Sequence, residues 1–260
     1  MREKRRYPAI ASLLSILVPG LCQFYNGQIR KASMLLFLRL ALLYVFLFTG
    51  MLDHYYGMVS LMLIEICICL FAIIDAVVIS IVRKKVVLRK YQRIYIYLLI
   101  IMIACGYSYF IDTSMVIGRK AEISSGSSMA PTLQANERFV IDTRTKHFKR
   151  GDIIVFWRPG GGQQQFVKRI IAIGGDTIEM KEGKVFVNGE EISESYITTP
   201  KMNTHWGPAQ IPEGQYFVLG DNRDNSLDSH IFGPISESLI IGKAKFIYWA
   251  SDTGRLGRQL

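Results

Sequence analysis

The chain has 260 residues, of which 50% are hydrophobic and 20% charged, and its mean hydropathy is +0.23. This composition excludes a disordered protein, a collagen-like repeat and a disulfide scaffold. Residues 1–93 carry 13 of the 31 Lys and Arg but only 4 of the 21 Asp and Glu, so nearly all of the +10 net charge lies there. Cations beside apolar segments are typical of membrane proteins, so we expect no nucleic-acid partner.

Three apolar runs in the N-terminal part are long enough to cross a bilayer, which needs about 20 residues: Ser33–Leu52, Met58–Val82 and Ile94–Ile111. A fourth run, Ile10–Tyr25, is shorter and contains Pro19 and Gly20, so we expect it to be re-entrant or interfacial. No A-x-A-like cleavage site follows it, so it is not expected to be a cleavable signal peptide. Residues 1–120 are therefore predicted to be a membrane anchor with three transmembrane helices and this short segment.

Basic residues predict the orientation of the anchor, because Lys and Arg concentrate in cytoplasmic loops. The basic groups at residues 2–6 and 83–93 should both be cytoplasmic. The last span then runs outward and places everything after it on the outer face of the cytoplasmic (inner) membrane. The protein is thus expected to be a multi-pass membrane protein.

Arg39, Glu65 and Asp75 lie inside the predicted spans, where charged side chains are costly. We favour a structural Arg–carboxylate pair between packed helices over a transport path, because the ionisable residues are too few for a proton relay. The stretch from Pro19 to Gly27 resembles a P-G-x-x-Q-x-Y-x-G motif of small membrane modules, and it predicts no chemistry.

From residue 121 the sequence pattern changes to short runs rich in Val, Ile, Phe and Tyr that are separated by turn residues. This pattern is typical of β-strands. The predicted strands are Arg138–Asp142, Ile153–Trp157, Phe166–Ile173, Thr177–Met180, Lys184–Val187, Tyr216–Leu219 and Ile240–Trp249. Glu182-Gly183 and Asn188-Gly189 are hairpin-turn signals. The fold class expected is thus N-terminal transmembrane α-helices followed by a mostly antiparallel β catalytic domain over residues 121–260.

Three polar clusters interrupt the strand pattern: residues 124–133, the pair Lys168 and Arg169, and residues 220–230. Taken singly, each is more typical of a loop, a solvent-facing cation or a turn. Strand side chains alternate, so one of the two cations must face inward, and the sequence does not say which. A buried Lys has a lowered pKa and can act as a general base, whereas Arg keeps its proton. With a Ser nucleophile from the first cluster, Lys168 predicts a Ser–Lys hydrolase.

Four segments, in this order, resemble bacterial type I signal peptidase: Ser128–Leu133, Gly151–Phe156, Val167–Asp176 and Gly220–Ser229. The resemblance implies a membrane-bound serine endopeptidase that removes N-terminal signal peptides from exported preproteins by a Ser–Lys dyad. The partners it implies are signal peptides, membrane lipid and, as a further candidate, the protein-export channel. No H-E-x-x-H or similar metal motif is found, so neither a metal nor a cofactor is expected.

The same resemblance implies roles for individual residues. Ser128 matches the nucleophile and Lys168 the general base, and the backbone N–H of Ser128 would be one oxyanion donor. The supporting set contains Ser226, which helps to position the Lys, together with Asp228, Gly126, Gly220 and Asp221. The substrate-binding set lines shallow apolar pockets and consists of Met129, Leu133, Phe166 and Val167.

Two positions depart from the family pattern. Gly126 stands where some members have a Ser that assists the oxyanion hole, so the second oxyanion donor is open. His230 stands where the family usually has an Arg that pairs with the carboxylate matching Asp228. Either His230 is a neutral hydrogen-bond partner of Asp228, or Arg223 pairs with Asp228 in place of the family arginine, or the active site is weaker without such a pair. The alternative function is a catalytically silent homologue that binds signal peptides or scaffolds the export machinery.

Overall fold

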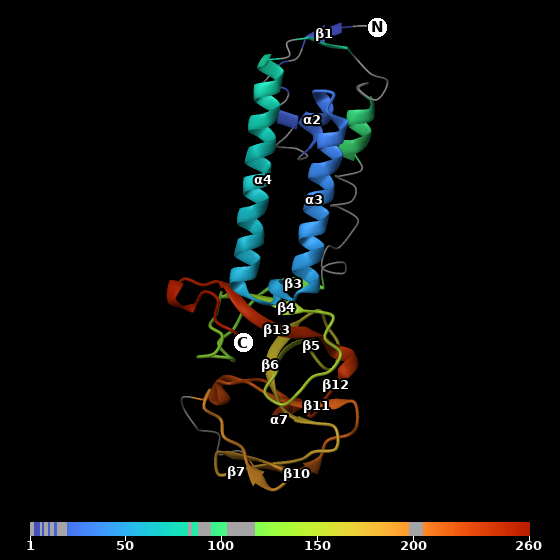
Figure 1. Ribbon diagram of the computed structural model, residues 1–260. Helices are drawn as coiled ribbons and strands as arrows, with labels where there is room; N and C mark the ends of the chain where they lie inside the picture. The colour runs from blue at the N-terminus through green and yellow to red at the C-terminus, as the bar shows by residue number, and fades with distance from the viewer. Residues whose placement is uncertain are drawn as a thin grey trace. The chain divides into compact units, whose positions relative to one another are not determined.

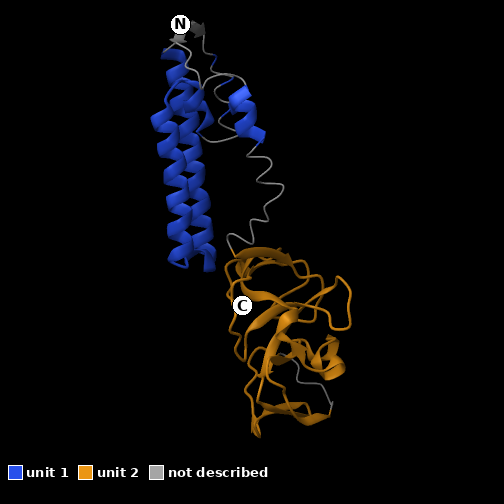
Figure 2. Ribbon diagram, turned by 90° about the vertical axis from the view of Figure 1, so that its right-hand side faces the viewer, with its two compact units in different colours: residues 1–116 blue, residues 117–260 orange. Residues whose placement is uncertain are grey.

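The computed structural model describes residues 3–5, 7, 10, 13–14, 20–82, 85–87, 95–102, 118–197 and 205–260 (Figure 1). Two compact units divide the chain: unit 1 is Met1–Val116 and unit 2 is Ile117–Leu260 (Figure 2). Unit 1 is mainly helical and unit 2 is built from antiparallel strands, which confirms the predicted fold class.

Unit 1 contains two long helices, α3 (Ile29–Phe48) and α4 (Tyr55–Val82), which are long and apolar enough to cross a membrane. Only 11% of the most apolar stretch of each is buried, unlike the core helix of a soluble protein. α3 begins four residues before the predicted span, because Arg30 and Lys31 are good helix formers and extend its first turn. Gly50, in the left-handed conformation, ends the helix, and the chain turns back into α4.

The other predicted membrane segments are described only in part. Of the predicted span Ile94–Ile111, residues 95–102 are described and are helical, and the rest lies outside the described residues. Within Ile10–Tyr25, the described end forms the five-residue helix α2 (Leu21–Tyr25). Both segments therefore stay predictions. Near the N-terminus, strand β1 (Glu3–Arg5) pairs antiparallel with β2 (Lys85–Val87), which follows α4 in the sequence.

Charged side chains link α3 to α4. Arg39 Nε lies 2.6 Å from Glu65 Oε2, which confirms the predicted structural pair between packed helices. Lys31 Nζ lies 2.8 Å from Asp75 Oδ1. Both pairs join the two helices within unit 1.

Helix α2 packs against α4 through side-chain amides. Gln23 Nε2 donates to the carbonyl oxygen of Ala72, and Asn26 Nδ2 donates to that of Ala76, each at 2.9 Å. Ala72 and Ala76 are buried and one turn apart, and their small side chains let the amides reach the backbone of α4. The motif that predicted no chemistry is therefore a helix-packing device.

Unit 2 contains a seven-stranded sheet in the order β12-β11-β6-β5-β13-β4-β3 and a four-stranded sheet in the order β10-β7-β8-β9. The strands are β3 (Arg119–Ile123), β4 (Arg138–Asp142), β5 (Ile153–Trp157), β6 (Gln165–Ile173), β7 (Thr177–Lys181), β8 (Lys184–Val187), β9 (Glu190–Glu191), β10 (Trp206–Gln210), β11 (Gln215–Leu219), β12 (Ile235–Ser236) and β13 (Ile240–Trp249). All of their pairings are antiparallel.

The predicted strands are confirmed closely. β4, β5, β8 and β13 have the predicted bounds, and β6, β7 and β11 differ from them by one residue at one end. Glu182 and Gly183 both have positive φ, as do Asn188 and Gly189, which is the geometry of the predicted two-residue hairpins. The strands missed include β3 and β10, because the first is dominated by charged residues and the second contains Pro208.

The register of β6 positions the two adjacent cations. Lys168 pairs with Ile154 of β5, and Arg169 pairs with Ile153 of β5 and Leu219 of β11. Since β6 has a partner strand on each side, its backbone is held firmly where the two side chains emerge. A helix of four residues, α7 (Ser229–Phe232), follows the polar segment after β11.

Candidate active site

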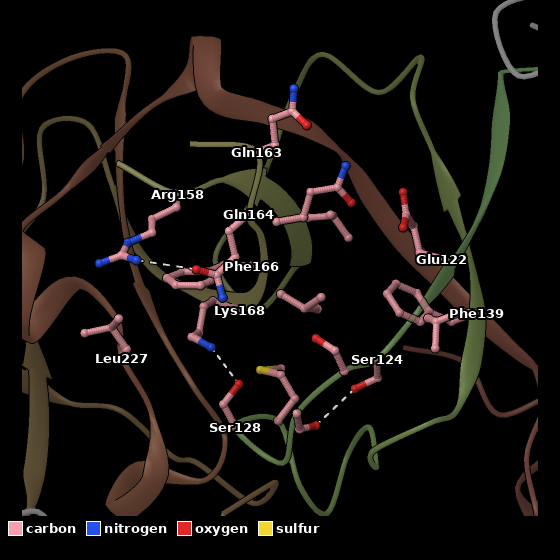
Figure 3. Close-up of a pocket in the computed structure, with 17 residues that line it drawn as sticks. Glu122, Ser124, Ser128, Phe139, Arg158, Gln163, Gln164, Phe166, Lys168 and Leu227 are labelled. Atoms are coloured by element: carbon pink, nitrogen blue, oxygen red, sulfur yellow. Dashed lines mark hydrogen bonds between the residues drawn. The ribbon is translucent and has the colours of Figure 1, made fainter. Parts of the chain in front are cut away.

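A cleft of about 740 Å³ opens on unit 2 (Figure 3). Its walls come from the segment after β3, the ends of β5 and β6, and Leu227 of the third polar cluster. Ser128 and Lys168 both line it, and their side chains point toward one another. The polar residues around its mouth were not foreseen from the sequence: Glu122, Arg158, Gln163, Gln164 and Gln165.

Lys168 is the inward cation that the sequence left open. Its side chain lies in the cleft with only 4% of the residue exposed, and its Nζ is 2.6 Å from Ser128 Oγ. The same Nζ lies 5.4 Å from the centre of the Phe166 ring. Arg169 turns to a different partner: its Nε and Nη2 contact the two oxygens of Asp221 at 2.9 and 2.7 Å. The structure thus brings together the two predicted dyad residues.

Burial lowers the pKa of Lys168 from its ordinary value of 10.5 to about 8. Asp228 and Asp221 act in the opposite direction, because their negative charges favour the ammonium form. Neither carboxylate forms an ion pair with Lys168 in the described part of the chain, since each is engaged elsewhere. A pKa of about 8 leaves a sizeable neutral fraction near neutral pH, which suits a general base.

The loop that carries Ser128 is anchored by the hydrophobic core and by a backbone hydrogen bond. Met129 and Leu133 are fully buried in a core cluster with residues of β4, β5 and β13. The backbone N–H of Asn222 donates to the carbonyl oxygen of Ser128 at 3.0 Å. A Cβ at Gly220 would lie 2.5 Å from that same oxygen, so only glycine lets the two segments approach so closely.

Asp228 is completely buried at the start of α7. Its Oδ2 accepts the backbone N–H of Gly220 at 2.9 Å, and its Oδ1 lies 2.5 Å from His230 Nδ1. Arg223 contacts Glu194 instead, so among the described residues His230, and not Arg223, is the side chain that pairs with Asp228.

Two of the predicted supporting residues, Ser226 and Gly126, take other positions, and so does Ser127 next to the nucleophile. Ser226 Oγ is buried and has no hydrogen-bond partner among the described residues, so it does not hold Lys168 by a hydrogen bond here. Gly126 is exposed, with open space where a side chain would begin. Ser127 Oγ accepts a hydrogen bond from Asn225 Nδ2 at 3.0 Å. Neither position 126 nor position 127 therefore directs a hydroxyl at the dyad.

Of the predicted substrate-binding set, Met129, Phe166 and Val167 line the cleft. Leu133 does not line it, because its side chain is 0% exposed and belongs to the core beneath the Ser128 loop. Its role in this structure is to support that loop.

Glu194 and Tyr196 were also missed from the sequence. Glu194 contacts the buried Arg223, and the ring of Tyr196 lies 4.1 Å from the Arg169 guanidinium. Both residues come from an irregular segment after β9, where no periodic pattern or motif could have indicated a contact with the active site.

Comparisons with known proteins show which family the chain resembles. The family model described as signal peptidase, peptidase S26, matches residues 93–249. Signal peptidase I of Leptolyngbya laminosa is 38% identical over 149 residues, covering 53% of this chain and 73% of that protein. Signal peptidase I U of Bacillus subtilis (strain 168) is 37% identical over 180 residues, covering 64% of this chain and 94% of that protein.

Among solved structures, a signal peptidase I from Enterococcus faecalis V583 shares 33% identity, covering 38% of this chain and 97% of its own, with a TM-score of 0.34. The family model alone spans more than half of the chain and includes Ser128, Lys168 and the segment around Asp228. The chain therefore belongs to the signal peptidase family, peptidase S26.

Proposed function

We propose that Ser128 and Lys168 are the nucleophile and general base with which this serine endopeptidase removes signal peptides from preproteins. The reaction is that of the family to which the chain belongs. The observation that supports the assignment of residues is the 2.6 Å approach of Lys168 Nζ to Ser128 Oγ inside the cleft. The catalytically silent alternative is not favoured, because the related proteins are named as peptidases.

The first step is attack of Ser128 Oγ on the carbonyl carbon of the scissile bond. Neutral Lys168 Nζ takes the hydroxyl proton as the oxygen attacks, and burial keeps enough of this amine neutral. The resulting ammonium then gives the proton to the nitrogen of the leaving chain. A water molecule, deprotonated by the same amine, hydrolyses the ester on Ser128 and restores the enzyme.

The negative charge on the substrate oxygen needs a hydrogen-bond donor. The backbone N–H of Ser128 has no acceptor in the described part of the chain, so it is available for this task. The anchoring of Met129 in the core holds this N–H in place. The second donor is not supplied by the side chain of residue 126 or 127.

Met129, Phe166 and Val167 would form the apolar part of the substrate site. The family resemblance implies that these pockets are shallow, so small side chains of the substrate would fit best. Asp221 and Gly220 would support the loop that carries Ser128, and Asp228 would hold their segment in place through the Gly220 N–H.

For localisation, we propose a multi-pass protein of the cytoplasmic membrane with unit 2 on the outer face. The two candidate spans, α3 and α4, support insertion in lipid. The pairing of β1 with β2 joins the two basic segments that both belong on the cytoplasmic side. Membrane lipid and the protein-export channel are the partners that this location implies.

The test is cleavage of a preprotein carrying an Ala-x-Ala site by detergent-solubilised wild type, Ser128→Ala and Lys168→Ala. We expect only the wild type to produce the mature chain. Lys184→Ala is the matched control, because Lys184 is an exposed cation of the same unit whose ion-pair partner among the described residues is Glu191. Cleavage by Ser128→Ala at the wild-type rate would refute the assignment.

A further inference from the structure

Arg223 is an internal cation next to the active site. Only 5% of it is exposed, and its Nε donates to the carbonyl oxygen of Gly220 at 3.0 Å. Its Nη1 and Nη2 both contact the carboxylate of Glu194, the first at 3.0 Å. No other carboxylate pairs with Arg223 within the described ranges, so Glu194 neutralises it and holds it in position.

Tyr196 extends the same segment to the second arginine. Its hydroxyl donates to Glu194 Oε1 at 2.8 Å, and its ring lies 4.1 Å from the Arg169 guanidinium. Arg169 in turn holds both oxygens of Asp221. Burial, with Glu194 as a further cause, raises the pKa of the Tyr196 phenol, so this hydroxyl keeps its proton. The Glu194–Tyr196 segment is therefore linked to Gly220 through Arg223 and to Asp221 through Arg169.

The backbone from Gly220 to Asn222 is in direct contact with the dyad loop. The N–H of Asn222 donates to the carbonyl oxygen of Ser128 at 3.0 Å. The Cα of Gly220 fits so closely that a Cβ there would lie 2.5 Å from that oxygen. A shift of this backbone therefore moves Ser128 relative to Lys168.

We propose that Glu194 is a positioning residue of the active site, which acts through Arg223 on the backbone of Gly220. Tyr196 assists by orienting the Glu194 carboxylate. The proposal rests on the function proposed for Ser128 and Lys168. Neither Glu194 nor Tyr196 is among the residues that line the cleft, so the effect falls on turnover and not on substrate binding.

The test uses the full chain with Glu194→Gln, which keeps the size of the side chain and removes its charge. We expect kcat to fall about 10- to 100-fold, because a small displacement of reacting groups is costly, while KM changes less than about twofold. Amide hydrogen exchange of the peptide that contains residues 220–222 should become faster. The matched control is Glu191→Gln, since Glu191 pairs with exposed Lys184 and should change neither quantity.

A double mutant tests the route of the effect. If Glu194 acts through Arg223, then Glu194→Gln causes no further loss of kcat in an Arg223→Met background. Additive losses in the double mutant would overturn this route. Should Glu194→Gln fail to fold, Tyr196→Phe removes only the hydroxyl contact with Glu194 and should give a smaller loss of kcat with the same unchanged KM.

Failure of this proposal differs from failure of the proposed function. If Ser128→Ala cleaves as well as wild type, the function proposed for the dyad fails, and the exchange of residues 220–222 still decides the role of Glu194. If the dyad variants are inactive but Glu194→Gln has normal kcat and normal exchange, the positioning role is overturned. A rise in KM alone would overturn it as well.

Discussion

Arg39 in unit 1 and Lys168 in unit 2 are both cations on mainly apolar elements, but they have different partners. Arg39 Nε lies 2.6 Å from a carboxylate oxygen of Glu65. Lys168 Nζ lies 2.6 Å from the Ser128 hydroxyl, and no ion pair joins it to a carboxylate in the described part of the chain. The paired guanidinium joins two helices, whereas a buried amine without a carboxylate partner loses its proton more readily and can act as a base.

The two carboxylates that could pair with Lys168, those of Asp221 and Asp228, are bound to other groups. Asp221 binds Arg169 through both oxygens, and Asp228 is held by the Gly220 N–H and by His230. Both carboxylates still act on Lys168 at longer range, but burial outweighs them and lowers its pKa. The arrangement keeps the base accessible to the substrate and partly neutral.

The largest effect is expected for Lys168→Arg, which keeps the charge but cannot lose a proton. Activity on a preprotein should fall about 1,000-fold or more, in the upper range for loss of a general base. Single-turnover cleavage by the purified full chain measures the loss. Lys184→Arg, at an exposed position of the same unit, should retain wild-type activity. Turnover by Lys168→Arg close to the wild-type rate would show that position 168 does not act as a base.

Lys168→Met should stabilise unit 2 at neutral pH. The pKa of Lys168 is about 8 in the folded chain against an ordinary 10.5, so the unfolded chain binds more protons between these values. The stability of wild type should therefore rise with pH from about 8 and level off above about 10.5. At pH 7 the wild type bears the full cost of burying the Lys168 ammonium, which is about 3 kcal/mol, and the variant does not.

Tryptophan fluorescence during denaturant unfolding measures this change, because Trp157, Trp206 and Trp249 all lie in unit 2. The stability curve of Lys168→Met should be flatter across the same pH range. A variant less stable than wild type at pH 7 would mean that the ammonium is well solvated or paired in the folded chain.

Gly220→Ala should lower kcat by about 100-fold, because the added methyl group would lie 2.5 Å from the carbonyl oxygen of Ser128 and closer still to Ser226 Oγ, so these groups must shift. Gly254→Ala is the comparison variant: the backbone of Gly254 is ordinary, and its nearest neighbour, the Asp252 side chain, lies 3.3 Å from the added carbon. Cleavage kinetics of both variants separate a local displacement from a general effect of adding a methyl group. Equal rates for the two would remove the argument for close approach at Gly220.

In unit 1, Arg39→Leu should destabilise the helical hairpin by about 2 kcal/mol, since it leaves Glu65 without its partner. The double variant Arg39→Leu/Glu65→Leu should recover most of this loss, because no charge remains unpaired. Loss of the far-UV helical signal during detergent-induced unfolding reports on unit 1, since the one α-helix described in unit 2 has four residues. A double variant no better than the single would argue against simple pairing.

The smallest effect is expected for Gln23→Leu, which removes the hydrogen bond from the side-chain amide to the Ala72 carbonyl oxygen. The same detergent unfolding should show a loss of about 1 kcal/mol. Ser60→Ala is the control, because Ser60 bonds the carbonyl of Gly57 within its own helix. An unchanged stability for Gln23→Leu would mean that this hydrogen bond contributes nothing to the packing of α2 on α4.

Much of this architecture was predictable from local patterns. The strand β5 is a run of five apolar residues with turn residues nearby, and its bounds were predicted correctly. The strand β3 was missed because its charged residues hide any alternation, and its pairing with β4 is a tertiary property. The pairing of Arg39 with Glu65 was predicted because charges inside apolar helices have few alternatives.

The site was predictable in its chemistry but not in its support. Alternation required one inward cation on β6, and the contacts of Lys168 with Ser128 and of Arg169 with Asp221 decide that it is Lys168. Glu194 lies 29 residues from Arg223, in a segment without periodic structure, so no local pattern could join them. Long-range ion pairs between single residues are invisible to an analysis of sequence spacing.

The most direct test of the account is the pH dependence of kcat/KM for the full chain, which reports the ionisation of the free enzyme. Because burial lowers the pKa of Lys168, we expect the rate to rise with pH, with a midpoint at about 8, and then to level off. A rate that does not change with pH across that range, or one that is still rising steeply toward 10.5, would contradict the claim that Lys168 is a neutral base at the moment of attack.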